Sequence, residues 1–346
     1  MQALKLFGKN DIRLAEAPVP SISDNEILLK VDAAAVCGTD IRMWQNGYKG
    51  VDEAHPLILG HELAGTVAEA GKNITSFKKG ERVALAPNIG CGICVRCVAG
   101  SPHLCDSYKA FGINMDGGFA EYTVVPEEAI RQGNLMALPE GVSPAEAALN
   151  EPLSCAYNGF LKCDVKPGDY AMVVGAGPIG LFHAMLLRMA GAGMVILNDI
   201  SEARLADAQA IVPGVVAYCG DGLEGFVRER TGGKGLDVAI VACPVPAAQS
   251  AMLPMMDYGG RVNFFGGIPA DKQPVAIDTN LVHYKELVLT GSTRSSTAMF
   301  RKTLGFVSAG LLPVSRLITG EYRIDETPAA FESAKAARGF KNVIVF

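Results

Sequence analysis

Residues 91–105 contain the sequence Cys91-Gly-Ile-Cys94-Val-Arg-Cys97, then seven residues and Cys105, and they indicate what kind of protein the chain forms. A closed structural zinc site takes four thiolates in a tetrahedron, each at about 2.3 Å from the metal. Gly90 and Gly92 allow the tight backbone that such ligand turns require. We therefore predict a structural zinc within a lobe spanning about residues 88–108, bound by Cys91, Cys94, Cys97 and Cys105.

Three other readings of this segment are a disulfide pair, an iron–sulfur cluster and four thiols without a ligand. The iron–sulfur reading is the strongest rival, because Cys-x-x-Cys-x-x-Cys opens the bacterial ferredoxin motif. That motif continues Cys-x-x-x-Cys-Pro, whereas here the fourth cysteine is eight residues on and precedes Asp106. The complete ligand count favours zinc, and a closed site of four thiolates has no open position for chemistry.

Length, composition and charge limit the possible classes of protein. The 346 residues predict two domains, and a net charge of −5 without a basic cluster argues against a nucleic-acid partner. Residues 171–187 lack Asp, Glu, Lys and Arg, but this stretch is shorter than the roughly 20 apolar residues of a membrane helix. The first ten residues lack the apolar core of a signal peptide. Cys155, Cys163, Cys219 and Cys243 resemble small buried thiols, so we expect a cytoplasmic protein.

The pattern of apolar residues changes near residue 162. Before it, short β-type runs alternate with Gly, Pro and Asn, at 27–31, 65–69, 82–85 and 120–125. After it, strand-like runs at 170–174, 194–198, 236–241 and 261–265 alternate with helical stretches, and a last β-type run covers 342–346. This alternation predicts a β-rich lobe followed by a doubly wound parallel sheet, an α/β fold.

The run at 170–174 is followed by Gly175-Ala-Gly177-Pro-Ile-Gly180, which opens an apolar helical stretch. A glycine turn between a strand and a helix is typical of dinucleotide binding, with the pyrophosphate at the helix N-terminus. Asp199 follows the next strand, where its carboxylate would accept hydrogen bonds from ribose hydroxyls and repel a 2′-phosphate. We therefore predict NAD rather than NADP, with Arg204 either stacked on the adenine or solvated on its helix.

A second, dispersed set of metal ligands is formed by Cys37, His61, Glu62 and Glu151. Thiolate, imidazole and carboxylate with an open fourth position are typical of a catalytic zinc. One thiolate and one carboxylate neutralise Zn²⁺, so we expect only one of Glu62 and Glu151 to bind the metal directly at a time. The sequence leaves open which of the two it is.

Together these segments resemble the zinc-dependent medium-chain alcohol dehydrogenase superfamily, and in particular its sorbitol (L-iditol, polyol) and threonine 3-dehydrogenase branch. The resemblance also covers residues 37–40, 117–122, 151–153 and 266–269. It implies a GroES-like catalytic domain over residues 1–155 and 291–346, and a Rossmann NAD-binding domain over residues 156–290. It further implies two Zn²⁺ per chain, NAD as cofactor, and a homotetramer or homodimer.

The same resemblance implies individual roles. Thr39 relays the substrate proton, Glu62 and Glu151 act in catalysis, and Thr39, Trp44, Glu151 and Arg294 contact the substrate. The implied cofactor contacts are Gly175, Gly177, Pro178, Ile179, Gly180, Asp199, Arg204, Gly266, Gly267, Ile268, Ser292, Thr293 and Arg294.

The chain departs from the family pattern near Thr39. Family members usually have His where this chain has Arg42, and sorbitol dehydrogenases have a substrate-contacting Tyr where it has Met43. Arg42 cannot act as a base near neutral pH, but it could hold the ribose or pyrophosphate of the cofactor.

The resemblance favours oxidation of a secondary alcohol of a polyol to a ketose with NAD⁺. The alternatives are a threonine-type dehydrogenase, a sugar-phosphate dehydrogenase with Arg42 or Arg294 on the phosphate, and a non-catalytic zinc- and dinucleotide-binding protein.

Overall fold

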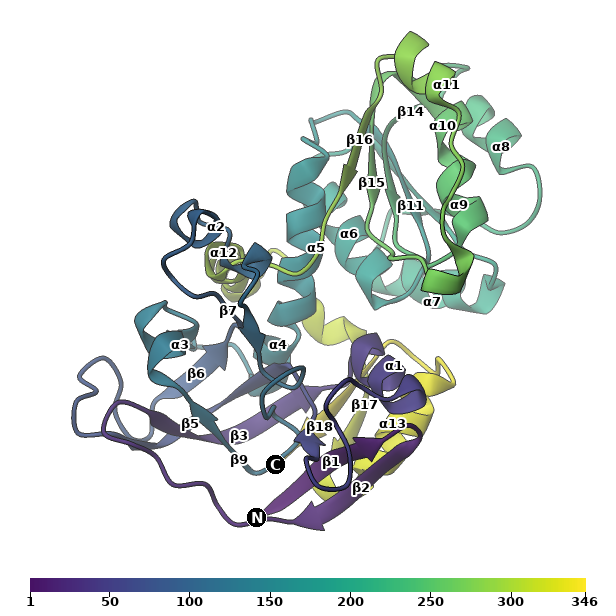
Figure 1. Cartoon of the computed structure of the whole chain (residues 1–346). Coiled ribbons are helices and arrows are strands. Elements are labelled where there is room, and N and C mark those ends of the chain that lie inside the picture. The colour runs from purple at the N-terminus through teal and green to yellow at the C-terminus, as the bar shows by residue number, and fades with distance from the viewer. The chain divides into compact units, whose positions relative to one another are not determined.

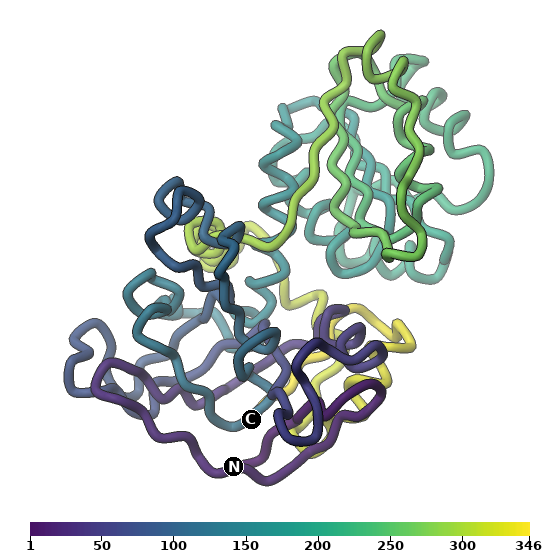
Figure 2. The backbone as a smooth tube through the Cα atoms, viewed as in Figure 1, coloured from purple at the N-terminus to yellow at the C-terminus, as the bar shows by residue number.

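The structure is a computed structural model that describes all residues from Met1 to Phe346. It divides into two compact units, Met1–Ser154 with Ser295–Phe346, and Cys155–Arg294. The first and last segments of the chain, purple and yellow in Figure 2, therefore belong to the same unit. The boundaries predicted from the sequence fall at 155/156 and 290/291.

The first unit is built on a seven-stranded sheet in the order β10-β6-β5-β3-β18-β17, with β9 also on β3. Its central strand β3 (Ile27–Ala35) pairs with β9 (Tyr122–Val125) through its first half and with β18 (Lys341–Val345) through its second half. The last strand of the chain thus lies beside one of the first. β3 is almost wholly buried, as its alanine- and leucine-rich sequence predicts.

Figure 1 labels most of the other strands and helices of this unit, and helix α5 begins in this unit and ends in the second. A smaller sheet has the order β2-β1-β4, and β7 pairs with β8. The bounds are β1 Gln2–Gly8, β2 Asp11–Glu16, α1 Gly38–Asn46, β4 Leu57–Ile58, β5 Glu62–Ala70, β6 Arg82–Leu85, β7 Asn88–Ile89, α2 Val95–Val98, η1 Pro102–Leu104, β8 Lys109–Ala110, α3 Glu127–Arg131, β10 Leu135–Ala137, α4 Pro144–Ala148, α5 Asn150–Lys162, α12 Thr297–Ser308, η3 Val314–Leu317, β17 Ile318–Arg323, η4 Ile324–Glu326 and α13 Thr327–Lys335.

The second unit is a six-stranded, all-parallel sheet in the order β13-β12-β11-β14-β15-β16. Helix α6 packs on β11 and β12, and α10 packs on β15 (Figure 1). The bounds are β11 Tyr170–Val174, α6 Pro178–Met189, β12 Met194–Asn198, α7 Glu202–Ile211, β13 Val216–Tyr218, α8 Leu223–Arg230, β14 Leu236–Val241, α9 Pro246–Ser250, α10 Met252–Met255, β15 Met256–Phe264, η2 Ala270–Lys272, α11 Thr279–Tyr284 and β16 Val288–Gly291. This strand order is that of the doubly wound dinucleotide-binding fold, which confirms the predicted α/β class.

None of the helices combines the length and the apolar character needed to cross a bilayer. The apolar stretch 171–187 is divided between β11 and α6, as its glycine turn predicts.

One buried side chain of the second unit makes stability depend on pH. His183 of α6 is fully buried, neither ring nitrogen has a hydrogen-bond partner, and burial lowers its pKa to about 3. Between pH 6.5 and 3 the unfolded chain therefore binds a proton there that the folded chain does not. Stability due to this site is fully present above pH 6.5 and falls as the pH falls.

The free energy of unfolding of wild type should fall by about 2 kcal/mol between pH 7 and pH 5 because of His183. We expect His183→Leu to remove this decrease. Urea unfolding of zinc-loaded wild type and variant at both pH values measures it. His283→Leu, which replaces an exposed histidine of the same unit, is the matched control. Equal pH dependence of wild type and His183→Leu would show that His183 is not the group responsible.

Candidate metal and dinucleotide sites

The four cysteines of the first segment converge on one point. Their sulfur atoms lie within 4.8 Å of one another, with Cys91 Sγ and Cys97 Sγ 3.9 Å apart and Cys94 Sγ and Cys105 Sγ 3.8 Å apart. A tetrahedron with metal–sulfur bonds of about 2.3 Å has edges of about 3.8 Å. The four thiols therefore fit a zinc ion without rearrangement.

The backbone of this lobe is shaped around the sulfurs. A Cβ on Gly90 would lie 2.5 Å from Cys97 Sγ, and Gly92 has a φ of +80°. Backbone N–H groups of Ile93 and Cys94 lower the pKa of the exposed Cys91 thiol to about 6. Such donors favour the thiolate form, which is the form that binds metal.

The second group of ligands is assembled by strand pairing. Cys37 follows β3 and is the N-cap of α1, while His61 and Glu62 stand at the start of β5. Ala35 of β3 is directly opposite Glu62 in the antiparallel pair, so the two strand ends meet. One ligand atom from each of Cys37, His61 and Glu62 lies within 4.8 Å of the other two.

Asp40 and Lys341 support this group from outside it. Asp40 Oδ2 accepts the N–H of Cys37 at 2.9 Å, and Oδ1 is 3.5 Å from His61 Nδ1, which leaves Nε2 for a metal. Buried Lys341 donates to Glu62 Oε2 and, at 3.0 Å, to the carbonyl of Val36. Burial alone would lower the pKa of the Lys341 ammonium, but the charges of Glu62 and Cys37 outweigh it and raise the pKa.

Neither supporting residue was predicted from the sequence. Asp40 could have been found, because it is the fourth residue of Cys37-Gly-Thr-Asp, at the N3 position of a helix. Lys341 has no such signal, because it is 279 residues from Glu62 and reaches it only through the pairing of β18 with β3.

The buried polar atoms of this group test whether a metal ion fits. Glu62 Oε1 is buried without a hydrogen-bond partner, whereas Asp40 Oδ1 and His61 Nδ1, also buried, face each other at 3.5 Å. Buried polar atoms are nearly always satisfied, so Glu62 Oε1 points to an additional ligand. Burial alone would raise the pKa of the Cys37 thiol, but His61 outweighs it and lowers the pKa to about 7, which favours the thiolate. The donor set fits zinc.

Glu151 lies nearby but outside this group. It is 7% exposed on the first turn of α5. Burial raises the pKa of Glu62, and the negative charge of Glu151 helps to raise the pKa of both Glu62 and Lys341. Its backbone carbonyl accepts a hydrogen bond from Ser154 Oγ at 2.7 Å.

Helix α1 carries the other side chains that the resemblance assigns to the reaction. Thr39 Oγ1 accepts a hydrogen bond from Arg42 Nη2 at 2.8 Å. Trp44 is buried, with its ring against Phe331 at 6.0 Å and below the Lys335 ammonium at 4.6 Å. These ring contacts of Trp44 are with α13, and its contact with substrate stays a prediction.

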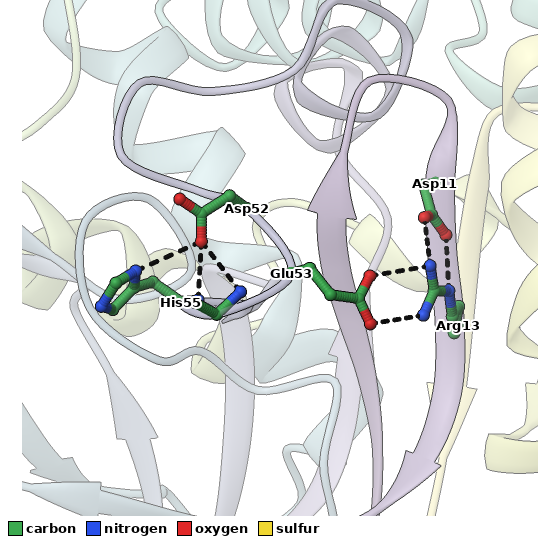
Figure 3. A network of polar contacts seen from close by, with 6 residues as sticks. Asp11, Arg13, Asp52, Glu53 and His55 are labelled. Carbon is green, nitrogen blue, oxygen red and sulfur yellow. Dashed lines mark hydrogen bonds and ion pairs between the residues drawn. The ribbon is translucent and has the colours of Figure 1, made fainter.

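The loop that follows α1 is tied to the β1–β2 hairpin. Arg13 of β2 binds Asp11 and, through a second pair of bonds of 3.0 Å, the carboxylate of Glu53 (Figure 3). In the same loop, Asp52 accepts from the N–H of His55 at 2.9 Å (Figure 3). At the other end, the N–H of Asn10 donates to the carbonyl of Trp44 at 2.6 Å. The hairpin therefore holds both the end of α1 and the loop after it.

The glycine turn of the second unit has the shape that a dinucleotide needs. Gly175 has a φ of +103°, and a Cβ on Gly180 would lie 1.8 Å from the carbonyl oxygen of Gly175. Gly177 is the N-cap of α6 without a side-chain cap, and a Cβ built on it would lie 3.6 Å from Arg204 Nη1. The first N–H groups of the helix, including those near Ile179, therefore have room for a phosphate.

The predicted ribose contact is anchored to this turn. Asp199 Oδ2 accepts the N–H of Ala176 at 2.7 Å, and Oδ1 accepts that of Ser201 at 3.0 Å. Both carboxylate oxygens keep a lone pair for further donors. Arg204, at the start of α7, brings its guanidinium towards Gly177, as the contact above shows.

The other two predicted cofactor segments follow β15 and β16. A Cβ on Gly266 would lie 2.4 Å from the carbonyl oxygen of Cys243, while Gly267 faces open space and Ile268 accepts a hydrogen bond from Gln273. Ser292 Oγ donates to Asn263, and Asn158 donates to the carbonyls of Thr293 and Arg294. Arg294 has a φ of +56°, which is uncommon for a residue other than glycine.

Two family models match the chain. The alcohol dehydrogenase GroES-like domain matches residues 23–136, and the zinc-binding dehydrogenase model matches residues 178–309. The chain is 32% identical over 348 residues to L-threonine 3-dehydrogenase of Pseudoalteromonas translucida, with 99% of each chain covered.

Solved structures extend the similarity over the full length. Alcohol dehydrogenase TADH from Thermus sp. ATN1 is 27% identical with a TM-score of 0.90, covering 100% of this chain and 99% of that chain. An alcohol dehydrogenase from Escherichia coli CFT073, complexed with NADH, is 26% identical with a TM-score of 0.90 and the same coverage.

Proposed function

This chain belongs to the zinc-dependent medium-chain alcohol dehydrogenase superfamily, whose members are NAD(P)-dependent oxidoreductases, and we propose that it transfers hydride from a secondary alcohol of a small polar substrate to NAD⁺. The proposal is supported above all by the group of Cys37, His61 and Glu62, whose ligand atoms lie within 4.8 Å of one another and include the buried, unsatisfied Glu62 Oε1. We assign the catalytic zinc to these three residues, because Glu62 Oε1 is an available ligand while Lys341 binds Oε2.

Zinc bound there would supply Lewis-acid polarisation of the alcohol oxygen. The side chains around it would move the proton and place the substrate. Thr39 Oγ1 already accepts from Arg42, so its own hydrogen is free to be donated while its second lone pair accepts the substrate proton. Glu151 would hold the substrate or a water molecule beside Glu62, and the four-cysteine site would keep its lobe folded.

Two substrate classes are candidates. A polyol that yields a ketose is supported by Glu151 and by Arg294, which we propose to contact a hydroxyl near the reacting carbon. A threonine-type substrate is supported by the similarity to L-threonine 3-dehydrogenase, at 32% identity over nearly the whole chain.

A screen of NAD⁺ reduction tests the function. Zinc-loaded protein is given polyols, L-threonine, sugar phosphates and simple secondary alcohols, and NADH formation is followed by absorbance. We expect turnover of one polar class well above the simple alcohols. If no alcohol in the panel reduces NAD⁺ or NADP⁺, the proposed activity is wrong.

The cofactor preference leads to a prediction for Asp199. We expect wild type to prefer NAD⁺ over NADP⁺ by about 30- to 1000-fold, because a carboxylate facing the 2′-phosphate costs about 2–4 kcal/mol. Asp199→Ala should reduce the ratio of kcat/KM for NAD⁺ to kcat/KM for NADP⁺, mainly by raising KM for NAD⁺. Asp207→Ala, which removes an exposed charge from helix α7 just after Asp199, is the control. An unchanged ratio in Asp199→Ala would mean that another residue contacts the ribose.

We further propose a cytoplasmic homotetramer or homodimer. All nine cysteines are free, which suits a reducing compartment. Strand β16 lies at the edge of its sheet with Val288 49% exposed, and such an edge can pair with another chain. Light scattering after gel filtration measures the number of chains.

A further inference from the structure

Arg42 is an exposed arginine on the first turns of α1, and its guanidinium is directed at the reaction site. Nη2 donates to Thr39 Oγ1 at 2.8 Å, and Thr39 is two residues from the zinc ligand Cys37. A Cβ built on Gly38 would lie 3.9 Å from Arg42 Nη1. The guanidinium therefore lies over the start of the helix, beside Gly38 and Thr39.

The charge of Arg42 has no acidic partner. Some arginines of the chain are neutralised, as Arg13 is by Asp11 and Glu53, and Arg261 is by Asp169. Arg42 forms no salt bridge, and its hydrogen bond to Thr39 uses one of its five N–H donors. An uncompensated planar cation next to a substrate-binding hydroxyl is suited to an anion.

Arg42 also cannot continue a proton relay. A guanidinium has no acceptor atom, so it cannot take a proton from Thr39. The proton that Thr39 takes must therefore leave by another route, and Arg42 is available for binding.

We propose that Arg42 binds a carboxylate on the substrate, so that the substrate class of this enzyme is a small hydroxy acid anion, amino acids with a secondary hydroxyl included. A carboxylate oxygen bound to Nη2 at about 2.8 Å would lie at most about 6 Å from Thr39 Oγ1. A hydroxyl one or two carbons from a carboxylate spans that distance. A neutral polyol would leave the cation without its counter-charge.

This inference rests on the proposed alcohol oxidation and adds the charge of the substrate to it. Matched acid–amide pairs isolate that charge, because the amide keeps the shape and loses the anion. Suitable probes are L-threonine with L-threoninamide, and 3-hydroxybutyrate with 3-hydroxybutyramide. The measured quantity is the ratio of kcat/KM for the acid to that for the amide, together with KM for NAD⁺.

We expect wild type to prefer the acid by at least about 10-fold, and Arg42→Gln to reduce the acid-to-amide ratio by roughly 10- to 100-fold. Arg42→Lys should restore part of the ratio, because it keeps the charge but not the planar fork. Arg316→Gln is the matched control, because Arg316 is exposed in the same unit and forms no salt bridge. Melting temperatures establish that each variant is folded.

An acid-to-amide ratio near one in wild type, or one that Arg42→Gln leaves unchanged, would overturn the assignment. A higher KM for NAD⁺ with equal losses for acid and amide would place the guanidinium on the cofactor instead. If no compound is oxidised, the proposed activity fails. Calorimetric titration of wild type and Arg42→Gln with the same pairs then decides the role of Arg42 alone, by whether the acid binds more tightly than the amide only in wild type.

Discussion

Replacing Cys37 by serine is expected to lower kcat/KM for alcohol oxidation by at least about 1,000-fold, since loss of the metal removes several kcal/mol of charge stabilisation. Cys37 is one of three residues whose ligand atoms converge, and its thiol has a pKa of about 7. A serine hydroxyl stays protonated and does not replace a thiolate. The melting temperature should change little, because the site is open and the substitution only replaces one sulfur atom by a smaller oxygen.

Two measurements accompany this variant. Elemental analysis should find two zinc ions per wild-type chain and one per Cys37→Ser chain. Cys219→Ser removes a thiol of the second unit that belongs to neither metal group, and it should keep both zinc ions and full turnover. Near-normal turnover by Cys37→Ser would show that the catalytic metal is not held there.

Cys105→Ser is expected to have the opposite pattern, a large loss of stability with an indirect effect on catalysis. Cys105 is 3% exposed, its sulfur accepts the N–H of Cys91, and it completes the tetrahedron of four sulfurs. Structural zinc contributes about 10–16 kcal/mol to the folding of zinc-finger peptides, so losing one of four thiolates should destabilise the lobe by about 5 kcal/mol or more.

The two cysteine variants are best compared side by side. Thermal unfolding should show a markedly lower melting temperature for Cys105→Ser than for wild type. The zinc content should fall to one ion per chain in each variant. Any turnover that remains in Cys105→Ser should have the wild-type acid-to-amide and NAD⁺-to-NADP⁺ ratios, because the four-cysteine lobe contacts no reacting atom. A Cys105→Ser protein as stable as wild type would mean that the four sulfurs hold no structural metal.

The strands of the second unit were the easiest part of the fold to predict. The sequence runs at 170–174, 194–198 and 236–241 coincide with β11, β12 and β14. Strands buried on both faces of a parallel sheet form continuous apolar runs, and glycine turns mark their ends. β15 was predicted too short, because its first part, Met256-Asp-Tyr-Gly-Gly260, is polar, glycine-rich and irregular in register.

The first unit was harder, because its pairings join distant parts of the chain. The hairpin of β1 and β2 was not predicted, since its strands mix apolar and charged residues around a short turn at Asn10. The metal-binding cysteines, His61 and Glu62 could be recognised from local motifs. The contact of Lys341 with Glu62 could not, since it depends on which strand lies beside β3.

The pairing of β18 with β3 sets the order in which parts of the chain can fold during synthesis. The four-cysteine lobe is complete once residue 105 has been synthesised, and the parallel sheet of the second unit once residue 291 has been. Lys341, the cation that contacts Glu62, follows Glu62 by 279 residues and is synthesised after both of these parts. A nascent chain can therefore fold its zinc lobe and its dinucleotide-binding sheet early, as domains generally do. The group of Cys37, His61 and Glu62 gains its Lys341 contact only when β18 has been synthesised and has paired with β3.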